Sequence, residues 1–205
     1  AAPVVIDFED FMVNVEIAGD LIVKSGSTTI AEMLGTFFLE IDGDSFKVFA
    51  TASLLVGPDI GKPASEKPLL GISTLGAFIV NSSGFAADLD VDLGVAIPGM
   101  SVDVSARVLI NTTGSDQEIM LPERIVEFVE QSADRGNSLA SGLLNRLEDR
   151  NGDKFYVIRG VAADITNAAT VQNLLSGRGP ITYTTDRFYV TAVIQGQFDF
   201  LGFAK

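Results

Sequence analysis

Apolar and polar residues alternate one by one through most of residues 11–110, and this period of two restricts what the chain can fold into. In "FAADLDVDL" one face would carry Phe85, Ala87, Leu89, Val91 and Leu93, and the other Asp88, Asp90 and Asp92. "SVDVSARVLI" follows the same rule, with Val102, Val104, Ala106 and Val108 predicted to point inward. Such alternation is typical of antiparallel strands with one buried face and one face in water.

The strands also recur in pairs. "GTFFLEIDGDSFKVFATASL" (35–54) resembles "GAFIVNSSGFAADLDVDL" (76–93), since each has Gly-x-Phe, a short apolar strand, a polar turn and a Phe that opens an alternating strand. The turns, Asp-Gly-Asp and Asn-Ser-Ser-Gly, have the composition of hairpin turns. The pattern predicts a repeated β-hairpin of roughly 20 residues.

The pattern changes after residue 115. "LPERIVEFVEQ" predicts a helix with Pro122 at its first position. Leu139, Leu143 and Leu147 have the spacing of a second helical stripe, and "TNAATVQNLLSG" predicts a third helix that ends at Gly177. "KFYVIRGV" predicts one strand within this helical region.

The end of the chain restates its beginning. "FMVNVEIAGDLIV" (11–23) aligns with "FYVTAVIQGQFDF" (188–200). We therefore expect three regions: β-hairpin repeats in 1–115, a helical insertion with one strand in 116–180, and a β segment in 181–205 that restates 4–26 and pairs with a neighbouring unit. The predicted fold class is mainly β, an elongated antiparallel sheet, sandwich or solenoid-like repeat of β-hairpins with a helical insertion.

Composition excludes several kinds of site. The chain has no Cys, His or Trp, so thiol nucleophiles, disulfides, Cys/His zinc sites and Ser-His-Asp triads are ruled out. A net charge of −13 repels nucleic acid. No apolar run reaches the roughly 18 residues of a transmembrane segment. The chain begins "AAPVV" without Met, which we interpret as a processed protein or a piece of a longer one.

Two acidic groups are candidate calcium ligands, and calcium is the only cofactor that the sequence suggests. The first is Asp88, Asp90 and Asp92, whose alternative is a solvated strand face. The second is Asp149, Asn151 and Asp153, which resemble half of a calcium loop but lack the Glu at its twelfth position, so an Asn-Gly turn is the alternative.

Asn81 and Asn111 each begin an Asn-x-Ser/Thr sequence, the acceptor motif for N-glycosylation. Turn formation explains the same residues without a glycan.

No motif predicts catalysis, and we expect the protein not to be an enzyme. The aromatic strands raise the alternative of a lipid groove lined by Phe37, Phe38, Phe46, Phe49, Phe78 and Phe85. A sheet packed on a second sheet or on the helices accounts for these residues without a ligand, so lipid is not favoured.

The segments "FLEIDGDSFKVFA", "GFAADLDVDL", "INTTG", "LPERIVEF" and "GQFDFLGFAK" resemble the long repeats of very large exported bacterial proteins, some of which carry the LEPR-XLL domain. The resemblance covers most of the chain. It implies repeated units and an extracellular or cell-surface location, and it transfers no catalytic residues.

These observations predict a structural module whose partners are copies of itself or adjacent repeats, joined end to end as a filament, sheath or giant surface protein. The predicted assembly strand has the inward face Phe188, Val190, Ala192, Ile194, Phe198 and Phe200. The alternative function is a ligand-binding module, either a lipid groove or a surface-glycan adhesin.

Overall fold

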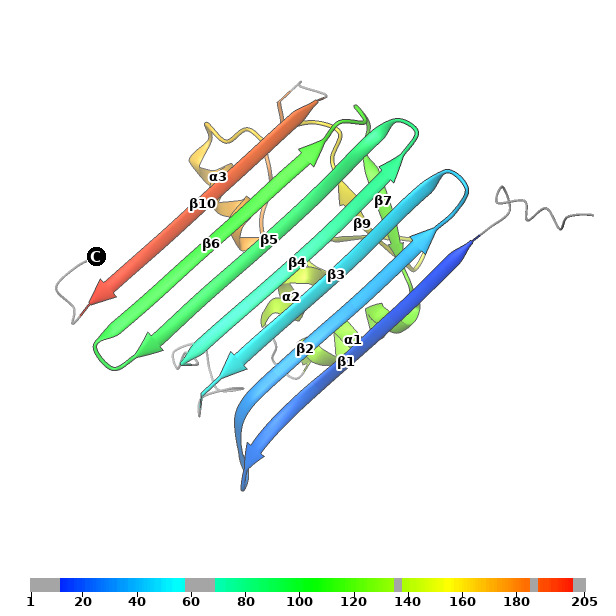
Figure 1. Cartoon of the computed structure of the whole chain (residues 1–205). Coiled ribbons are helices and arrows are strands. Elements are labelled where there is room, and N and C mark those ends of the chain that lie inside the picture. The colour runs from blue at the N-terminus through cyan, green and yellow to red at the C-terminus, as the bar shows by residue number, and fades with distance from the viewer. Residues whose placement is uncertain (1–11, 58–68, 135–137, 185–187, 201–205) are drawn as a thin grey trace, which may run out of the picture.

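The computed structural model describes residues 12–57, 69–134, 138–184 and 188–200. Its main element is a seven-stranded sheet in which every neighbouring pair is antiparallel. In sheet order the strands are β1 (Val13–Ser25), β2 (Thr28–Ile41), β3 (Ser45–Val56), β4 (Leu70–Asn81), β5 (Gly84–Ile97), β6 (Met100–Asn111) and β10 (Tyr189–Phe200). The mainly β fold predicted from the alternation is confirmed (Figure 1).

The two predicted hairpins are β2–β3 and β4–β5, and side chains stabilise their turns. Asp42 Oδ1 accepts hydrogen bonds from the N–H groups of Asp44, at 2.9 Å, and Ser45, at 2.7 Å. Asn81 Oδ1 accepts from the Ser83 N–H at 2.9 Å. Short polar side chains that bond the backbone two or three residues ahead favour turns over continued strands.

The segment between β6 and β10 lies on one face of this sheet, behind it in Figure 1. It contains β7 (Gln117–Leu121), α1 (Glu123–Asp134), α2 (Ser138–Leu144), β8 (Leu147–Arg150), β9 (Asp153–Ile158) and α3 (Ala168–Ser176). β7, β9 and β8 form a second, three-stranded sheet, so the prediction of one strand was wrong. Leu147 opens β8 instead of extending the second helix, because the Asn151–Gly152 turn folds this stretch into a hairpin with β9.

Helix α3 matches its prediction. The side chain of Asn167 accepts hydrogen bonds from the N–H groups of Ala169 and Thr170 at its start. Gly177 ends it with φ of 65°, a left-handed conformation that glycine adopts without steric strain.

The core lies between the large sheet and this cover. Its largest fully buried side chains are apolar or aromatic and come from both layers: Phe38, Phe49 and Ile79 from the large sheet, and Ile119, Ile125, Val129, Tyr156 and Ile158 from the cover. A smaller cluster packs α3 against β6 and β10 through Leu174, Leu109 and Val193. One face of the sheet is therefore a conventional protein interior.

The C-terminal strand has a partner inside the chain. β10 pairs with β6 without a break from Tyr189, opposite Asn111, to Phe200, opposite Met100. One edge of β10 is therefore occupied within the chain, so the predicted pairing with a neighbouring unit stays a prediction for the edge that remains. Its other edge, like one edge of β1, forms a margin of the sheet.

Candidate functional site

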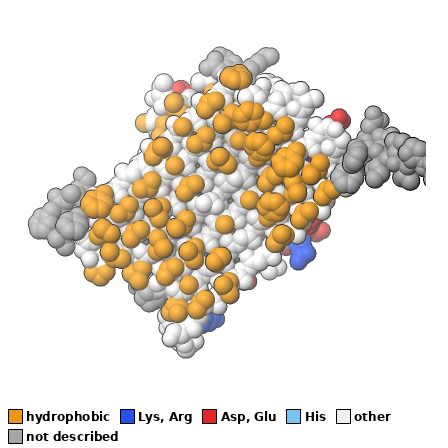
Figure 2. All heavy atoms as spheres, in the orientation of Figure 1, with side chains coloured by type: hydrophobic (Ala, Val, Ile, Leu, Met, Phe, Trp, Pro, Cys, Tyr) orange, Lys and Arg blue, Asp and Glu red, His pale blue; other side chains and the backbone are white. Residues whose placement is uncertain are grey.

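The face of the large sheet opposite the cover is apolar from margin to margin. Strand pairing places residues of all seven strands in rows across it, one of which is Ile17, Phe37, Ala50, Gly76, Leu89, Val108 and Ala192. Among the described side chains that the register puts on this face, up to the bulge at Val23, Thr74 is the single polar one. Figure 2 shows hydrophobic side chains over the whole face, with charged ones only at its margins. We call it the open face.

The open face is exposed in the described chain. Its accessible large side chains include Ile17, Leu21, Met33, Phe46, Phe85, Leu89, Val91, Val190, Ile194 and Phe198. The inward direction predicted for Val102, Val104, Ala106 and Val108 is thus wrong. The alternate residues of β10, predicted to face inward in the sheet of a neighbouring unit, are exposed in the described chain. Ile194 is 74% exposed, whereas its neighbour Val193 is 9% exposed. The side chain of Phe200 lies outside the described residues.

The covered face takes the acidic residues instead, and Asp88 is 1% exposed. The Arg107 guanidinium binds both of its oxygens, through Nε at 2.9 Å and Nη2 at 2.6 Å. The Tyr156 hydroxyl donates to Asp88 at 2.6 Å, and Arg107 Nη1 donates to the Leu174 carbonyl at 2.9 Å. This cluster joins β5 and β6 to β9 and α3, so it fastens the cover to the sheet.

The electrostatics of the cluster keep its charges in place. Burial opposes the Arg107 charge, but the adjacent Asp88 carboxylate outweighs it and raises the pKa of Arg107. Burial, together with the Asp88 charge, raises the pKa of the Tyr156 hydroxyl. Tyr156 is therefore a neutral hydrogen-bond donor and Arg107 a permanent cation at physiological pH. The arrangement stabilises one carboxylate and offers no activated nucleophile or base.

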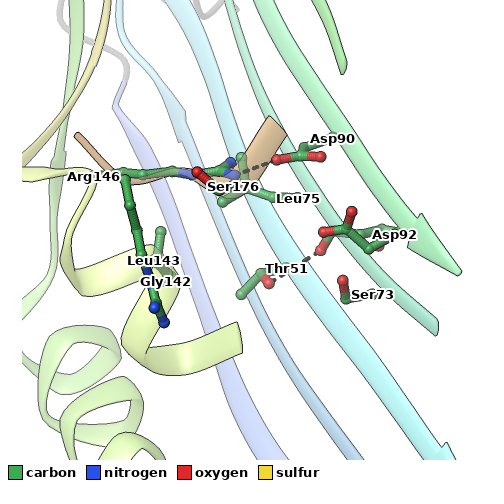
Figure 3. A pocket seen from close by; sticks show the side chains of 11 residues that line it. Thr51, Ser73, Leu75, Asp90, Asp92, Gly142, Leu143, Arg146 and Ser176 are labelled. Carbon is green, nitrogen blue, oxygen red and sulfur yellow. Dashed lines mark hydrogen bonds and ion pairs between the residues drawn. The ribbon is translucent and has the colours of Figure 1, made fainter. Parts of the chain in front are cut away.

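Asp90 borders a small pocket of about 250 Å³ between the sheet, α2 and α3 (Figure 3). Its Oδ2 pairs with Arg146 Nη2 at 2.5 Å, while Asp90 Oδ1 and Arg146 Nε are buried without a hydrogen bond among the described residues. Asp92, Thr51 and Ser73 also line the pocket. The pocket has charges of both signs and has room for a small polar molecule or water.

We expect Asp90 to make the protein less stable as pH rises. Burial raises its pKa above the ordinary 3.8, and the pairing with Arg146 opposes this only in part. The folded state then holds a proton that the unfolded state has lost, so stability falls between pH 3.8 and the raised pKa and levels off above it. Urea unfolding of wild type and Asp90→Asn from pH 3 to 7 should show the wild type losing stability relative to the variant. A constant or growing advantage of the wild type would contradict this expectation.

The structure does not assemble the predicted calcium sites. Guanidinium groups pair with Asp88 and Asp90, and Asp92 lies beside them at the pocket. Asn151 and Gly152, with φ of 58° and 97°, form the turn of the β8–β9 hairpin. Asp149 binds the Gly152 N–H and the Lys154 ammonium there. In the described part of the chain no three acidic residues cluster in a way that could hold a metal ion.

The two candidate glycosylation sites differ. Asn111 is fully buried, and its Nδ2 donates to the carbonyls of Ser115 and Arg159, each at 3.0 Å. A glycan on that nitrogen is incompatible with this fold, so the prediction for Asn111 was wrong. Asn81 is half-buried at the β4–β5 turn, and its Nδ2 donates to Gln117 Oε1 at 2.7 Å.

The six phenylalanines proposed for a lipid groove separate onto two faces. Phe38 and Phe49 lie in the covered core. Phe37, Phe46, Phe78 and Phe85 lie on the open face, where Phe46 meets Phe78 edge to face with ring centroids 6.3 Å apart. They do not line one groove. The open face does contain a shallow hollow of about 520 Å³ over β1 to β4, whose floor includes Gly19, Gly35 and Ala52.

The outer strands of the sheet are the two segments that restate each other. β1 and β10 are six antiparallel steps apart, so they run in the same direction at opposite margins (Figure 1). Ile17 and Ile194 both lie on the open face, as do Gly19 and Gly196. The two similar segments therefore run in the same direction and place their matching residues on the same face of the sheet.

Sequence reasoning missed Arg107, Tyr156 and Arg146, the residues that allow the acidic row to be covered. A cation in the alternating strand "SVDVSARVLI" was the available signal for Arg107, because it points to the same face as the acidic row of the preceding strand. Tyr156 and Arg146 come from the insertion and gave no local signal.

None of the described helices has the length and apolar character needed to span a bilayer. No family model matches the chain, and neither the curated proteins nor the solved structures include a detectable relative.

Proposed function

We propose that the protein is a structural module of an extracellular or cell-surface assembly, and that its large sheet is continued from unit to unit at its outer edges. The observation that supports this proposal is the pair of margins formed by β1 and β10, which restate each other in sequence, direction and face. The extracellular location rests on the sequence resemblance. The pocket beside Asp90 does not favour a second function, since two of its charged side chains, Asp90 and Arg146, are paired with each other.

Both margins are long and suited to strand addition. β10 pairs with β6 over twelve residues without a register shift, and neither β1 nor β10 contains proline. β1 has one bulge, at Val23/Lys24 near its end. Long edge strands without proline expose backbone donors and acceptors that recruit another strand, and the bulge of β1 leaves the residues before Val23 in regular register.

Under this proposal the units could join in two different ways. In a tandem chain, β10 would act as the first strand of the next unit, and a strand like β2 would pair antiparallel with its outer edge. Between separate copies related by translation, the outer edge of β10 would meet the outer edge of β1, and the two would pair in parallel because they run in the same direction. In either case the open faces of successive units would form one continuous surface.

Cross-linking through introduced cysteines tests the edges directly, because the chain has no cysteine of its own. Gln197→Cys on β10 should cross-link with Glu16→Cys or Asp20→Cys on β1 when the two variants are mixed. All three side chains are exposed and lie on the same side of the sheet. Asp44→Cys, at the exposed β2–β3 turn, is the matched control and should give only background product.

Electron microscopy of the same samples should show chains of units rather than discrete particles. Mixed samples that cross-link no more than the Asp44→Cys control would sink the edge-to-edge proposal. So would products formed only between identical Gln197→Cys copies, because a two-fold contact closes after one step.

A further inference from the structure

We propose that the open face is covered by the open face of a second copy of this chain, so that two sheets form a sandwich with the covers outside. This inference goes beyond the edge-to-edge function and is independent of it.

The size of the open face suits a stable interface. Seven strands about 4.8 Å apart, with roughly 12 residues rising about 3.3 Å each, give a face of about 30 Å by 40 Å, or about 1,200 Å². The largest apolar patch on a typical monomer is about 300–600 Å², and a standard interface buries about 800 Å² per partner. The open face, with Thr74 as its single described polar side chain, therefore has the size and the composition of a buried interface.

The charge distribution permits an identical partner on the open face. The chain has 27 acidic and 14 basic residues, yet the rows of the open face have no charged side chain among the described residues. Two copies with a net charge of −13 repel each other through their other surfaces. Bringing the open faces together places no like charges in contact, and it turns the covers and their charges outward.

Small residues in the middle of the open face point to a close approach from outside. Gly19, Gly35 and Ala52 lie side by side in one row, with Ala50 and Gly76 in the next. A Cβ at Gly19 would meet nothing within 4 Å, and at Gly35 or Gly76 only ordinary van der Waals contacts at 3.6 and 3.5 Å. None of the three has a positive φ, so the chain itself does not require glycine at these positions.

Glycine inside a strand is destabilising by roughly 0.5–1 kcal/mol relative to alanine, and it often marks a site where another backbone comes close. The small residues other than Gly76 form the floor of the hollow described above, which we call the trough. Large side chains stand beside it, among them Ile17, Phe37 and Met33. Sheets that pack face to face lie about 10 Å apart with interdigitated side chains. A second copy displaced along the strands would place its large side chains in the trough.

Analytical ultracentrifugation of the full chain over a range of concentrations tests the inference. Wild type should form dimers, and Leu89→Lys should raise the dimer dissociation constant by about 100-fold or more, because each copy would bury an unpaired ammonium group. Leu89 is 48% exposed, so the monomer should tolerate the change. Met120→Lys is the matched control: Met120 is 52% exposed on β7, outside the open face, and this variant should dimerise like wild type.

Gly35→Val separates the packing of two open faces from the folding of the single chain, because the two effects are expected to have opposite signs. Valine suits a strand better than glycine, so the monomer should melt at a higher temperature. The added side chain fills the trough, so the dimer should weaken. Dimers that withstand both Leu89→Lys and Gly35→Val would overturn the inference, as would a wild type that stays monomeric. Native mass spectrometry that finds stoichiometric acyl lipid on a monomer would overturn it in favour of lipid. These variants leave both margins of the sheet intact. The result of the edge cross-linking experiment is therefore independent of the result for the face-to-face dimer.

Discussion

Asp88→Ala is expected to lower the free energy of unfolding by about 3–5 kcal/mol, because it leaves the Arg107 cation buried without its counterion. Arg107 is 9% exposed and keeps its charge, since no accessible pH removes it. A loss of this size is a large share of the roughly 5–15 kcal/mol that stabilises a typical domain. The measurement is urea or guanidinium unfolding followed by circular dichroism.

Two further variants show whether the buried ion pair is the cause. Replacing both partners, as Asp88→Leu with Arg107→Met, should recover much of the loss, because hydrophobic groups that replace a buried pair are often nearly neutral. Tyr156→Phe removes a single hydroxyl from Asp88 and should be milder, roughly 1–3 kcal/mol. An Asp88→Ala protein within 1 kcal/mol of wild type would refute the role assigned to this cluster.

The second large effect is expected on β3, where two phenylalanines three residues apart face opposite sides of the sheet. Phe49 is 0% exposed and packs against Tyr156 with ring centroids 5.4 Å apart. Phe49→Ala should lower the free energy of unfolding by about 3–5 kcal/mol through lost burial and the cavity that remains. Phe46 lies on the open face at 36% exposure.

Phe46→Ala is the matched control within the same strand and should lower the stability of the isolated chain by less, about 1–2 kcal/mol, because the side chain is only partly buried and its removal leaves no enclosed cavity. Unfolding is measured at protein concentrations low enough to keep copies apart. Equal losses from the two variants would show that the two faces of β3 are buried alike in the isolated chain, contrary to the fold described.

The helices illustrate how far local signals reach. Pro122 and the sequence that follows it predicted α1, and Asn167 and Gly177 are the cap residues of α3. Leu147 had helical spacing from Leu143 but lies in β8, because the hairpin closed by Asn151 and Gly152 pairs it with Tyr156. Spacing alone cannot show that a residue pairs with a strand further along the chain.

The sequence by itself determined the strands of the large sheet, the turns of its two repeated hairpins and the division of each of these strands into two faces, because the period of two is a local property of an extended backbone. It also showed that the two ends of the sheet region restate each other.

Only the tertiary structure decided which face is covered, and the choice went against the usual rule that the apolar face is buried. The acidic row can be covered because Arg107 lies in register beside it and Tyr156 reaches it from a strand 68 residues further along the chain. A buried carboxylate requires partners, and the sequence pattern within one strand does not show partners that arrive from distant elements. The apolar rows were consequently left facing outward, as the surface that we assign to a second copy.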